Sequence, residues 1–296
     1  MRKVITGIGF LIFFALITAS FYFAPISGAN NFSDTQYSIK DTSNVDSVRV
    51  PVIMYHQVLK SKLGQYIVTD KQLEEDLIAF KNAGYEPVFS DDVANFVKRG
   101  GTLPKKPIIL TFDDGHYNFL SYAFPLLEKY GMKAEVNVIG CFTEFSTSSG
   151  DHSNPAYSYL TWEQIKFIAD SGIIKVGTHT YAMHSYKPRF GISRKYGESD
   201  EQYFKALKDD IEKLNGILLD RCGVKVTSFA FPFGKYNDEA TDILKQYGIE
   251  VMYTCNEGIS IVKRGEEKTL SRLRRINRDG RISTKELLDR IEYYYN

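Results

Sequence analysis

The sequence PIILTFDDGH, residues 107–116, contains the pattern from which the rest of the chain can be interpreted. Its first part has the length and β-branching of a buried strand, so two adjacent carboxylates, Asp113 and Asp114, stand where the strand ends. Neighbouring side chains on an extended strand point to opposite faces, and Gly115 allows the chain to turn there. One carboxylate could bind a metal ion while the other handles a proton. The alternative is a plain Asp-Gly turn that caps the following helix.

Strand-like and helix-like segments alternate along the whole chain after residue 49. Strands are expected at residues 50–55, 86–89, 108–112, 133–139, 174–177, 227–231, 250–254 and 270–276. Helices are expected at residues 70–83, 91–98, 117–130, 162–171, 200–219, 238–247 and 284–294, with a long Ser/Thr-rich loop at residues 141–159. This alternation predicts parallel strands joined by right-handed crossovers, in a sheet or barrel that forms a single domain.

The composition excludes several classes of protein. Hydrophobic residues make up 43% of the 296 residues, which is enough for a full core and excludes a disordered or fibrous chain. Lys plus Arg total 37 and Asp plus Glu total 36, so the charge balance gives no reason to expect a nucleic-acid partner. Three scattered cysteines do not make a disulfide framework. Buried thiols are expected, and one bridge with one free thiol is the alternative.

The N-terminal region has the pattern of a membrane-directing segment. A basic start precedes an uncharged apolar run over residues 4–23, long enough to span a bilayer, and residues 27–29 resemble a small-residue cleavage site. Residues 1–29 are therefore expected to be a membrane anchor or a signal peptide, and residues 30–48 a flexible linker. The folded domain is expected at residues 49–296, outside the cytoplasm, either anchored to the membrane or secreted.

Two histidines follow the expected strand at residues 174–177. His179 and His184 are separated by five positions, so both can bind one ion only if the segment between them is a loop or a loop that enters a helix. Together with Asp114 they would supply two imidazoles and a carboxylate, which suits zinc or a similar divalent ion. Two structural histidines are the alternative.

A third strand end is followed by FPFGK, residues 231–235. Pro232 has a fixed φ and no N–H, and Gly234 lets the backbone turn close to a bound group. Backbone N–H groups held in this way could point at a developing oxyanion. An ordinary Pro/Gly turn is the other interpretation.

TFDDG, the His-Thr-x-x-x-x-His segment and the Phe-Pro-x-Gly turn, in this order, resemble motifs one to three of the polysaccharide deacetylases, the NodB-homology group of carbohydrate esterase family 4. The resemblance extends from about residue 50 to the C-terminus. It implies a distorted (β/α) barrel and a metal-dependent removal of N-acetyl groups from glycans.

The resemblance also implies roles for individual residues. Asp113 would be the general base toward the hydrolytic water, and the Phe233 N–H would hold the oxyanion. Asp114, His179 and His184 would bind one divalent ion, with zinc expected and cobalt, nickel, iron or manganese as alternatives.

Three departures from the usual family pattern are informative. The five-position His spacing and the N-terminal sequence VPVIMYH resemble the branch that deacetylates poly-β-1,6-N-acetylglucosamine, in which the barrel is circularly permuted. No His follows His184, which excludes the C-terminal acid histidine of the usual family pattern, and the resemblance to the permuted branch, in which the N-terminal Tyr-His supplies this group, implies that His56 is the general acid. Ala230 occupies the position of the usual motif-three Arg, which leaves Arg275 or Lys235 to orient the base.

The expected function is therefore removal of N-acetyl groups from a cell-surface or extracellular glycan of the poly-β-1,6-N-acetylglucosamine type, a component of biofilms. Peptidoglycan or chitin oligomers are the alternative substrates. An inactive barrel that binds glycan in an exopolysaccharide assembly is an alternative of another class. The expected partners are an N-acetylglucosamine-containing polysaccharide and, if the N-terminal segment is retained, a membrane.

Overall fold

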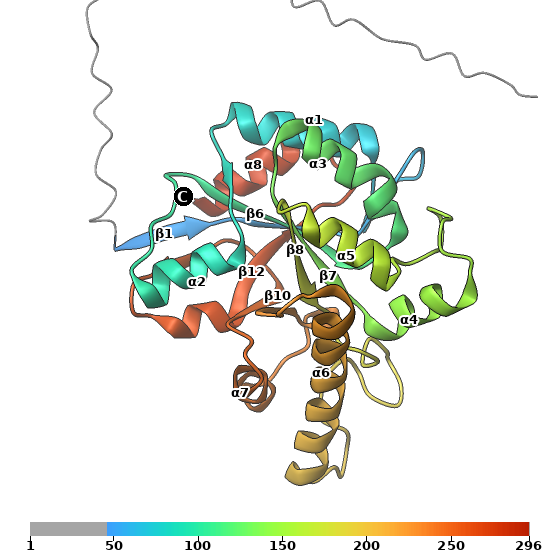
Figure 1. The fold of residues 1–296 in the computed structure, drawn as a ribbon. Coiled ribbons are helices and arrows are strands. Elements are labelled where there is room, and N and C mark those ends of the chain that lie inside the picture. Colours follow the sequence, from blue (N-terminus) through green and yellow to red (C-terminus); the bar gives the residue numbers. More distant parts are fainter. Residues whose placement is uncertain (1–45, 296) are drawn as a thin grey trace, which may run out of the picture. The chain divides into compact units, whose positions relative to one another are not determined.

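Seven parallel strands close into a barrel in the region that the computed structural model describes, residues 46–295 (Figure 1). Their order around the barrel is β2-β12-β10-β9-β8-β7-β6, and β6 pairs back onto β2. The expected (β/α) barrel is thereby confirmed. Because β2 lies between β12 and β6, the first and last barrel strands in sequence are neighbours. A circular permutation of the usual order stays a prediction.

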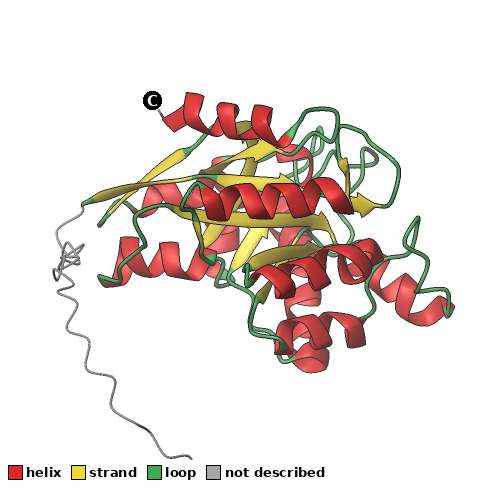
Figure 2. Ribbon diagram, turned by 90° about the horizontal axis from the view of Figure 1, so that it is seen from above, coloured by secondary structure: helices red, strands yellow, loops and turns green. Residues whose placement is uncertain are grey.

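The barrel strands are β2 (Val52–Tyr55), β6 (Pro107–Asp114), β7 (Ala134–Val138), β8 (Ile174–Thr178), β9 (Ser228–Ala230), β10 (Val251–Glu257) and β12 (Leu273–Asn277). The other strands are β1 (Ser47–Val50), β3 (Gln57–Leu59), β4 (Ile67–Thr69), β5 (Glu86–Pro87) and β11 (Ser260–Lys263). The α-helices are α1 (Asp70–Asn82), α2 (Ser90–Arg99), α3 (Phe124–Tyr130), α4 (Gly140–Ser149), α5 (Trp162–Asp170), α6 (Asp200–Cys222), α7 (Asp238–Gln246) and α8 (Thr284–Tyr295). A π-helical turn (Phe119–Ala123) and 3₁₀ turns (Pro232–Gly234 and Glu267–Arg272) complete the set. Figure 2 shows helices on both sides of the strands.

Helix boundaries follow local sequence signals. At the start of α6 the Ser199 hydroxyl accepts a hydrogen bond from the Gln202 N–H, and the Gln202 side chain accepts one from the Ser199 N–H. This capping box satisfies two of the four N–H groups that a helix start leaves unpaired. The helix ends at Gly223, which has a φ of 69°, a conformation that glycine adopts without strain.

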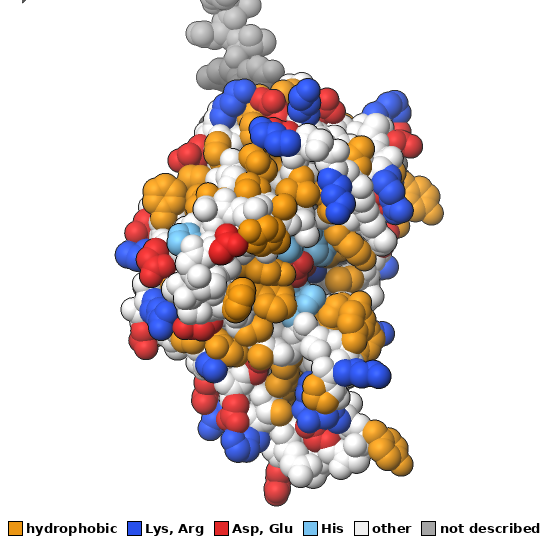
Figure 3. Space-filling view, turned by 90° about the vertical axis from the view of Figure 1, so that its right-hand side faces the viewer, with side chains coloured by type: hydrophobic (Ala, Val, Ile, Leu, Met, Phe, Trp, Pro, Cys, Tyr) orange, Lys and Arg blue, Asp and Glu red, His pale blue; other side chains and the backbone are white. Residues whose placement is uncertain are grey.

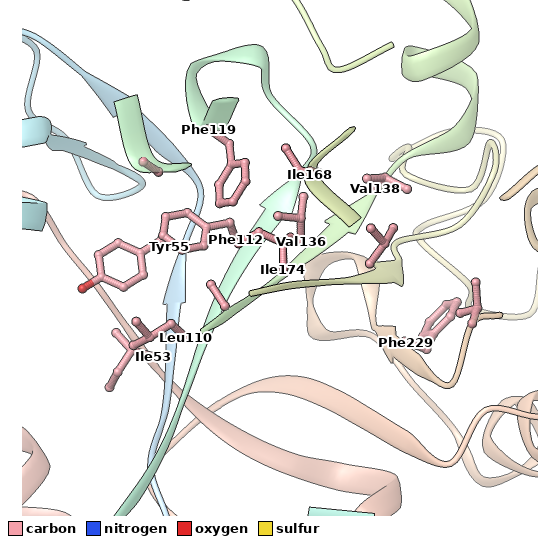
Figure 4. Close-up of a cluster of buried hydrophobic side chains, with 14 of the residues drawn as sticks. Ile53, Tyr55, Leu110, Phe112, Phe119, Val136, Val138, Ile168, Ile174 and Phe229 are labelled. Atoms are coloured by element: carbon pink, nitrogen blue, oxygen red, sulfur yellow. The ribbon is translucent and has the colours of Figure 1, made fainter. Parts of the chain in front are cut away.

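Successive side chains of each strand point alternately outward and inward, and this separates an apolar outer face from a partly polar barrel interior. On β6, Leu110 and Phe112 point outward into the layer between strands and helices (Figure 4). There the rings of Tyr55 and Phe112 stack at 4.9 Å, and Phe119 meets Phe112 edge-on at 4.9 Å. Thr111, the residue between Leu110 and Phe112, is buried and donates a hydrogen bond to the Ile53 carbonyl. The outer face therefore supplies most of the apolar burial, and the interior can hold polar groups.

Residues 141–159 were expected to form a loop, and this expectation is wrong for the first half, which is α4. Hydroxyl groups usually compete with helix formation, but here Thr147 donates to the Thr143 carbonyl and Ser149 to the Ser146 carbonyl in the same helix. Glu144 also accepts a hydrogen bond from the Trp162 indole at 2.7 Å. These contacts hold a helix that composition alone does not favour.

Two further boundaries differ from the expected ones. The helix expected over residues 117–130 is a π-helical turn followed by α3, because Pro125 lacks the N–H that a regular helix interior needs. The first strand of the described region, β1, begins at Ser47, two residues before the expected start of the domain. It pairs antiparallel with β11, a contact between residues more than 200 positions apart that composition does not reveal.

Several predictions concern residues outside the described region. The expected anchor or signal peptide at residues 1–29 and most of the expected linker at residues 30–48 lie there. Among residues 46–295, no helix is long and apolar enough to cross a membrane. The cysteines in this region are free thiols, as expected, but only Cys222 is buried. Cys255 is exposed, since it follows the last buried residue of β10 at the open end of the barrel.

Candidate active site and metal centre

The residues expected to carry the chemistry meet at the carboxyl end of the barrel. In the register of the sheet, Tyr55 pairs with Phe112, so the next residues along, His56 and Asp113, lie at the same level. Asp114 pairs with Val138 and Val138 with Thr178, which places His179 at that level too. Strand ends far apart in sequence thus deliver their polar side chains to one place, as expected of parallel strands.

Asp113 points into the barrel interior and is 2% exposed. Both of its carboxylate oxygens face the Arg275 guanidinium, with N–O distances of 2.9 and 2.8 Å. Asn137 donates a further hydrogen bond to the same carboxylate at 2.8 Å. Burial raises the pKa of Asp113, but the charges of Arg275 and His179 lower it by more, and the pKa is about 2. Asp113 is therefore a carboxylate at neutral pH, held in one orientation.

Of the two residues suggested for orienting Asp113, Arg275 occupies that position. Its Nε donates to the Thr254 carbonyl at 2.9 Å and its Nη1 to the Thr111 hydroxyl at 3.3 Å, so the guanidinium is held on several sides. Lys235 instead lies over the ring of Phe190, 5.1 Å from its centroid. An arginine from β12 thus contacts Asp113, whereas Ala230 occupies the position where the resemblance would place an arginine.

Asp114 leaves the strand in a left-handed conformation, with a φ of 74°, and Gly115 continues it with the same φ. Beyond this turn the Asp114 carboxylate faces His116, His179 and His184, whereas that of Asp113 faces Arg275. Burial raises the pKa of Asp114, but the hydrogen bond from His116 and the neighbouring imidazoles lower it well below its usual range. The carboxylate is therefore ionised although it is largely buried.

The three expected ligands fit a divalent metal ion. Asp114 Oδ1 is buried and has no hydrogen-bond partner within the described part of the chain. The Nε2 atoms of His179 and His184 lie 3.7 and 3.6 Å from it, and the three ligand atoms all lie within 4.8 Å of one another. An unsatisfied buried carboxylate oxygen facing two imidazole nitrogens is costly without a cation. One oxygen and two nitrogens form a donor set that zinc prefers.

The orientation of His179 suits metal binding. Its Nδ1 lies 2.7 Å from the Ala230 carbonyl oxygen, to which it donates, and this leaves Nε2 with a free lone pair toward Asp114. Burial lowers the pKa of His179 to about 4, although the charge of Asp113 opposes this. The imidazole is therefore neutral at pH 7, the form that binds a metal.

The five-position spacing of the two histidines is accommodated by a loop, as expected. Thr180 has a φ of 74°, and its hydroxyl accepts a hydrogen bond from the Met183 N–H. The N–H groups of Tyr181 and Ala182 donate to the two oxygens of Asp210, at 2.7 and 2.8 Å. Asp210 belongs to α6, so a helix that brings no metal ligand fixes the loop between the two ligands.

We expect the Asp210→Asn variant to bind Zn²⁺ about 10- to 100-fold more weakly than the unchanged protein. The amide has one acceptor oxygen for two backbone N–H groups, so one of them loses its partner and the loop between His179 and His184 loosens. Competition with a chromophoric chelator would measure the affinity. Asp209→Asn, at an exposed position one residue earlier on α6, is the control. Equal affinities in all three proteins would contradict the assigned role of Asp210.

His116 supports the site from one side. Its Nε2 lies 3.5 Å from Asp114 Oδ2, and its ring stacks on Tyr159 at 4.7 Å. Because His116 directly follows TFDDG where the next helix is expected to begin, the sequence favours a supporting or helix-start position for it rather than metal binding. The geometry agrees, because His116 faces the oxygen of Asp114 that is turned away from the two imidazoles.

His56 lies at the same end of the barrel and packs against the ring of Tyr66 at 4.7 Å. Burial lowers its pKa, while the charges of Asp114 and Asp113 oppose this effect. Its Nδ1 is buried without a hydrogen-bond partner in the described chain, whereas the residue as a whole is only partly buried.

The turn Pro232–Gly234 places Phe233 beside the metal ligands. Phe233 has a φ of 57°, and its ring lies 4.4 Å from the ring of His184. The N–H groups of Gly234 and Lys235 donate to the carbonyls of Phe231 and Pro232, so both are occupied. Within residues 46–295, the Phe233 N–H makes no hydrogen bond outside this turn. It remains a donor for a bound group.

Two residues that support the site, Asn137 and Asp210, did not emerge from the sequence. Asn137 and Glu135 are polar residues that alternate with Ala134, Val136 and Val138 on β7, and this period-two pattern could have indicated the polar interior. Asp210 gave no signal, because an acidic residue on a helix is usually exposed.

Comparison with known proteins agrees with this geometry. Residues 100–252 match the family model described as polysaccharide deacetylase, which is just over half of the chain. The chain belongs to the polysaccharide deacetylase family. The matched segment contains Asp113, Asp114, His179, His184 and the Pro232–Gly234 turn, whereas His56 and Arg275 lie outside it.

Among curated polysaccharide deacetylases, the poly-beta-1,6-N-acetyl-D-glucosamine N-deacetylase of Escherichia coli (strain K12) is 25% identical over 212 residues. The match covers 65% of this chain and 31% of the relative, so the chain spans about a third of that protein. The enzyme of the same name from Staphylococcus epidermidis is 24% identical over 196 residues, covering 66% of this chain and 64% of the relative.

Solved structures of deacetylases show the same fold. The Streptococcus pyogenes deacetylase PplD in complex with acetate superposes on this chain with a TM-score of 0.66 at 24% identity. The superposition covers 82% of this chain and 98% of the PplD chain. IcaB from Ammonifex degensii superposes with a TM-score of 0.66 at 23% identity, covering 84% of this chain and 98% of its own.

Proposed function

We propose that this protein is a metal-dependent N-deacetylase that hydrolyses acetamide groups of poly-β-1,6-N-acetylglucosamine. One observation carries the proposal: an Asp114 oxygen without a hydrogen-bond partner and two imidazole nitrogens form a set of metal-binding atoms next to the buried carboxylate of Asp113. The reaction consumes one water and yields acetate and an ammonium group on the sugar. A divalent ion bound by Asp114, His179 and His184 would supply Lewis acidity to the acetamide carbonyl and to water.

The residues of this chain divide the remaining work. Asp113, held as a carboxylate by Arg275 and Asn137, takes a proton from the attacking water. The Phe233 N–H donates to the oxygen that gains charge when the carbonyl carbon becomes tetrahedral. His56, entering the step as an imidazolium, passes a proton to the leaving nitrogen, so that the sugar departs as an amine rather than as an anion.

The substrate is proposed on two grounds. Curated relatives named poly-beta-1,6-N-acetyl-D-glucosamine N-deacetylase match about two thirds of this chain. The five-position histidine spacing and the N-terminal Tyr-His are features that this chain shares with that branch by resemblance. We further propose that residues 1–29 direct the protein out of the cytoplasm, where it meets such a glycan as an anchored or secreted enzyme.

Acetate release tests the proposal. The full 296-residue chain would be treated with a chelator, then assayed on β-1,6- and β-1,4-linked N-acetylglucosamine pentasaccharides with and without added Zn²⁺ or Co²⁺. We expect release only with metal, and faster release from the β-1,6-linked glycan. In the same assay His56→Ala should lower the rate by roughly 10²- to 10⁴-fold, and His152→Ala, in a loop outside the site, should not.

The alternatives give different results. Faster release from the β-1,4-linked glycan would favour chitin or peptidoglycan as the substrate. Metal binding without release from either glycan would favour an inactive glycan-binding barrel. Failure to bind any divalent ion would overturn the proposal.

A further inference from the structure

Three aromatic rings form a continuous surface beside the candidate active site. Tyr186 and Phe190 come from the segment between His184 and α6, and Phe233 comes from the turn after β9. The ring of Tyr186 lies 4.5 Å from that of Phe233 and 5.3 Å from that of Phe190, and Phe190 lies 5.2 Å from Phe233. We call Tyr186, Phe190 and Phe233 the aromatic platform.

The platform is open to solvent and joins the metal ligands. Tyr186 is 70% exposed and Phe190 is 36% exposed. Phe233 bridges to the site, because its ring lies 4.4 Å from that of His184. Figure 3 shows histidine and acidic side chains in a hollow that is bordered by hydrophobic side chains.

The segment that carries the platform is anchored. The Gly191 N–H donates to the Ser185 carbonyl and closes the loop between them. Gly191 has a φ of 55°, and a Cβ there would lie 2.9 Å from the Pro232 carbonyl oxygen, so the loop sits tightly against the Pro232–Gly234 turn. Only glycine satisfies both conditions at this position.

A buried arginine fixes the same loop from the other side. Arg189 is 7% exposed, and its guanidinium donates to both oxygens of Glu198 and to the Ser193 carbonyl. Segment 185–199 is rich in basic residues, which are usually exposed to solvent, but Arg189 is buried. Because the loop is already held in place without a ligand, it would lose little conformational entropy when a ligand binds.

We propose that the aromatic platform binds the pyranose ring of a sugar residue next to the one that is deacetylated. In β-linked N-acetylglucosamine every ring substituent is equatorial, so each face of the ring presents a patch of C–H groups. Such a patch matches the flat apolar face of Tyr186 or Phe190, which would otherwise remain in contact with water. An apolar surface next to a polar, metal-binding hollow is the arrangement expected for a glycan whose rings are apolar and whose acetamide is polar. This inference rests on the proposed function, and it adds a second subsite, whose occupation requires an oligosaccharide.

Glycan binding without turnover tests the platform directly. The full chain carrying Asp113→Asn would be titrated calorimetrically, in the presence of Zn²⁺, with β-1,6-linked N-acetylglucosamine pentasaccharide and with the monosaccharide. We expect the pentasaccharide to bind more tightly, and Tyr186→Ala in this background to weaken it by about three- to tenfold, the worth of one aromatic contact. Tyr186→Trp should retain the affinity because it retains a ring face, and Tyr186→Leu should not.

Tyr196→Ala is the matched control, because Tyr196 belongs to the same segment and is fully exposed. The affinity of the Tyr196→Ala variant for the pentasaccharide should be unchanged. In the protein with Asp113 intact, Tyr186→Ala should raise KM for the pentasaccharide by a similar factor while kcat changes little.

The outcomes separate this inference from the proposed function. The proposed role of the platform would be wrong if Tyr186→Ala released acetate with an unchanged KM, or if Tyr186→Leu bound the pentasaccharide as tightly as the protein with Tyr186. Either result would leave the proposed deacetylase activity unaffected. Binding that depends on Tyr186 in a chain that releases no acetate would support the platform and overturn the deacetylase. No difference between pentasaccharide and monosaccharide would also overturn the platform.

Discussion

The Asp113→Asn variant is expected to release acetate about 10²- to 10⁴-fold more slowly than the unchanged protein while it still binds one divalent ion. The amide has nearly the same shape as the carboxylate but cannot take a proton from water. Asp113 is not among the three converging ligand atoms, so the metal site should persist. Acetate release and metal content by elemental analysis would be measured on the same preparation.

Asp114→Asn is the matched comparison, because it makes the same chemical change one residue later. Here the unsatisfied oxygen that faces His179 and His184 loses its charge, so we expect loss of both the metal and the activity. Equal metal loss in the two variants would contradict the division of roles between the neighbouring aspartates, as would activity of Asp113→Asn within tenfold of the unchanged protein.

Arg275→Met is expected to lower the free energy of unfolding by about 3–5 kcal/mol, because it leaves the buried Asp113 carboxylate without its cation. For a domain of this size the corresponding fall in Tm is roughly 6–20 °C. Activity should fall as well, since Asp113 loses the group that orients it. Calorimetry of the two proteins would measure the difference.

Arg274→Met is the control, because Arg274 is the next residue on β12 and its side chain is exposed. It should change Tm little. Asp113→Leu combined with Arg275→Met should regain much of the lost stability, since no buried charge remains, and stay inactive. If Arg275→Met alone were as stable as the unchanged protein, the ion pair would not stabilise the barrel.

The same ion pair gives the stability a defined pH dependence. The pKa of Asp113 is about 2 in the folded protein against an ordinary value of 3.8, so its contribution is complete above about pH 4. As the pH falls from 4 to 2 the carboxylate gains a proton and the contribution is lost. The Tm difference between the unchanged protein and Arg275→Met should therefore shrink over this interval.

Much of the site could be predicted from sequence because its residues lie in short segments that follow strands. The two aspartates, the histidine pair and the Pro/Gly turn each depend on a strand end and the turn after it, both of which are local. The structure brings them together, with His56, at one end of the barrel. Their chemical roles, the metal and the substrate stay predictions, tested by the experiments above.

What the sequence by itself determined was the alternation of strands and helices and the polar residues at the strand ends, because hydrophobic period and turn chemistry are local properties. These left a sheet or a barrel open, and only the resemblance to the family favoured the barrel. The tertiary structure alone decided which cation meets Asp113. Arg275 and Asp113 are 162 residues apart, and either of two basic residues was compatible with the sequence. It also decided that Asp210 clamps the histidine loop and that Tyr186, Phe190 and Phe233 form one surface. Such contacts depend on the closure of the barrel, which brings side chains together without any pattern in the intervening sequence.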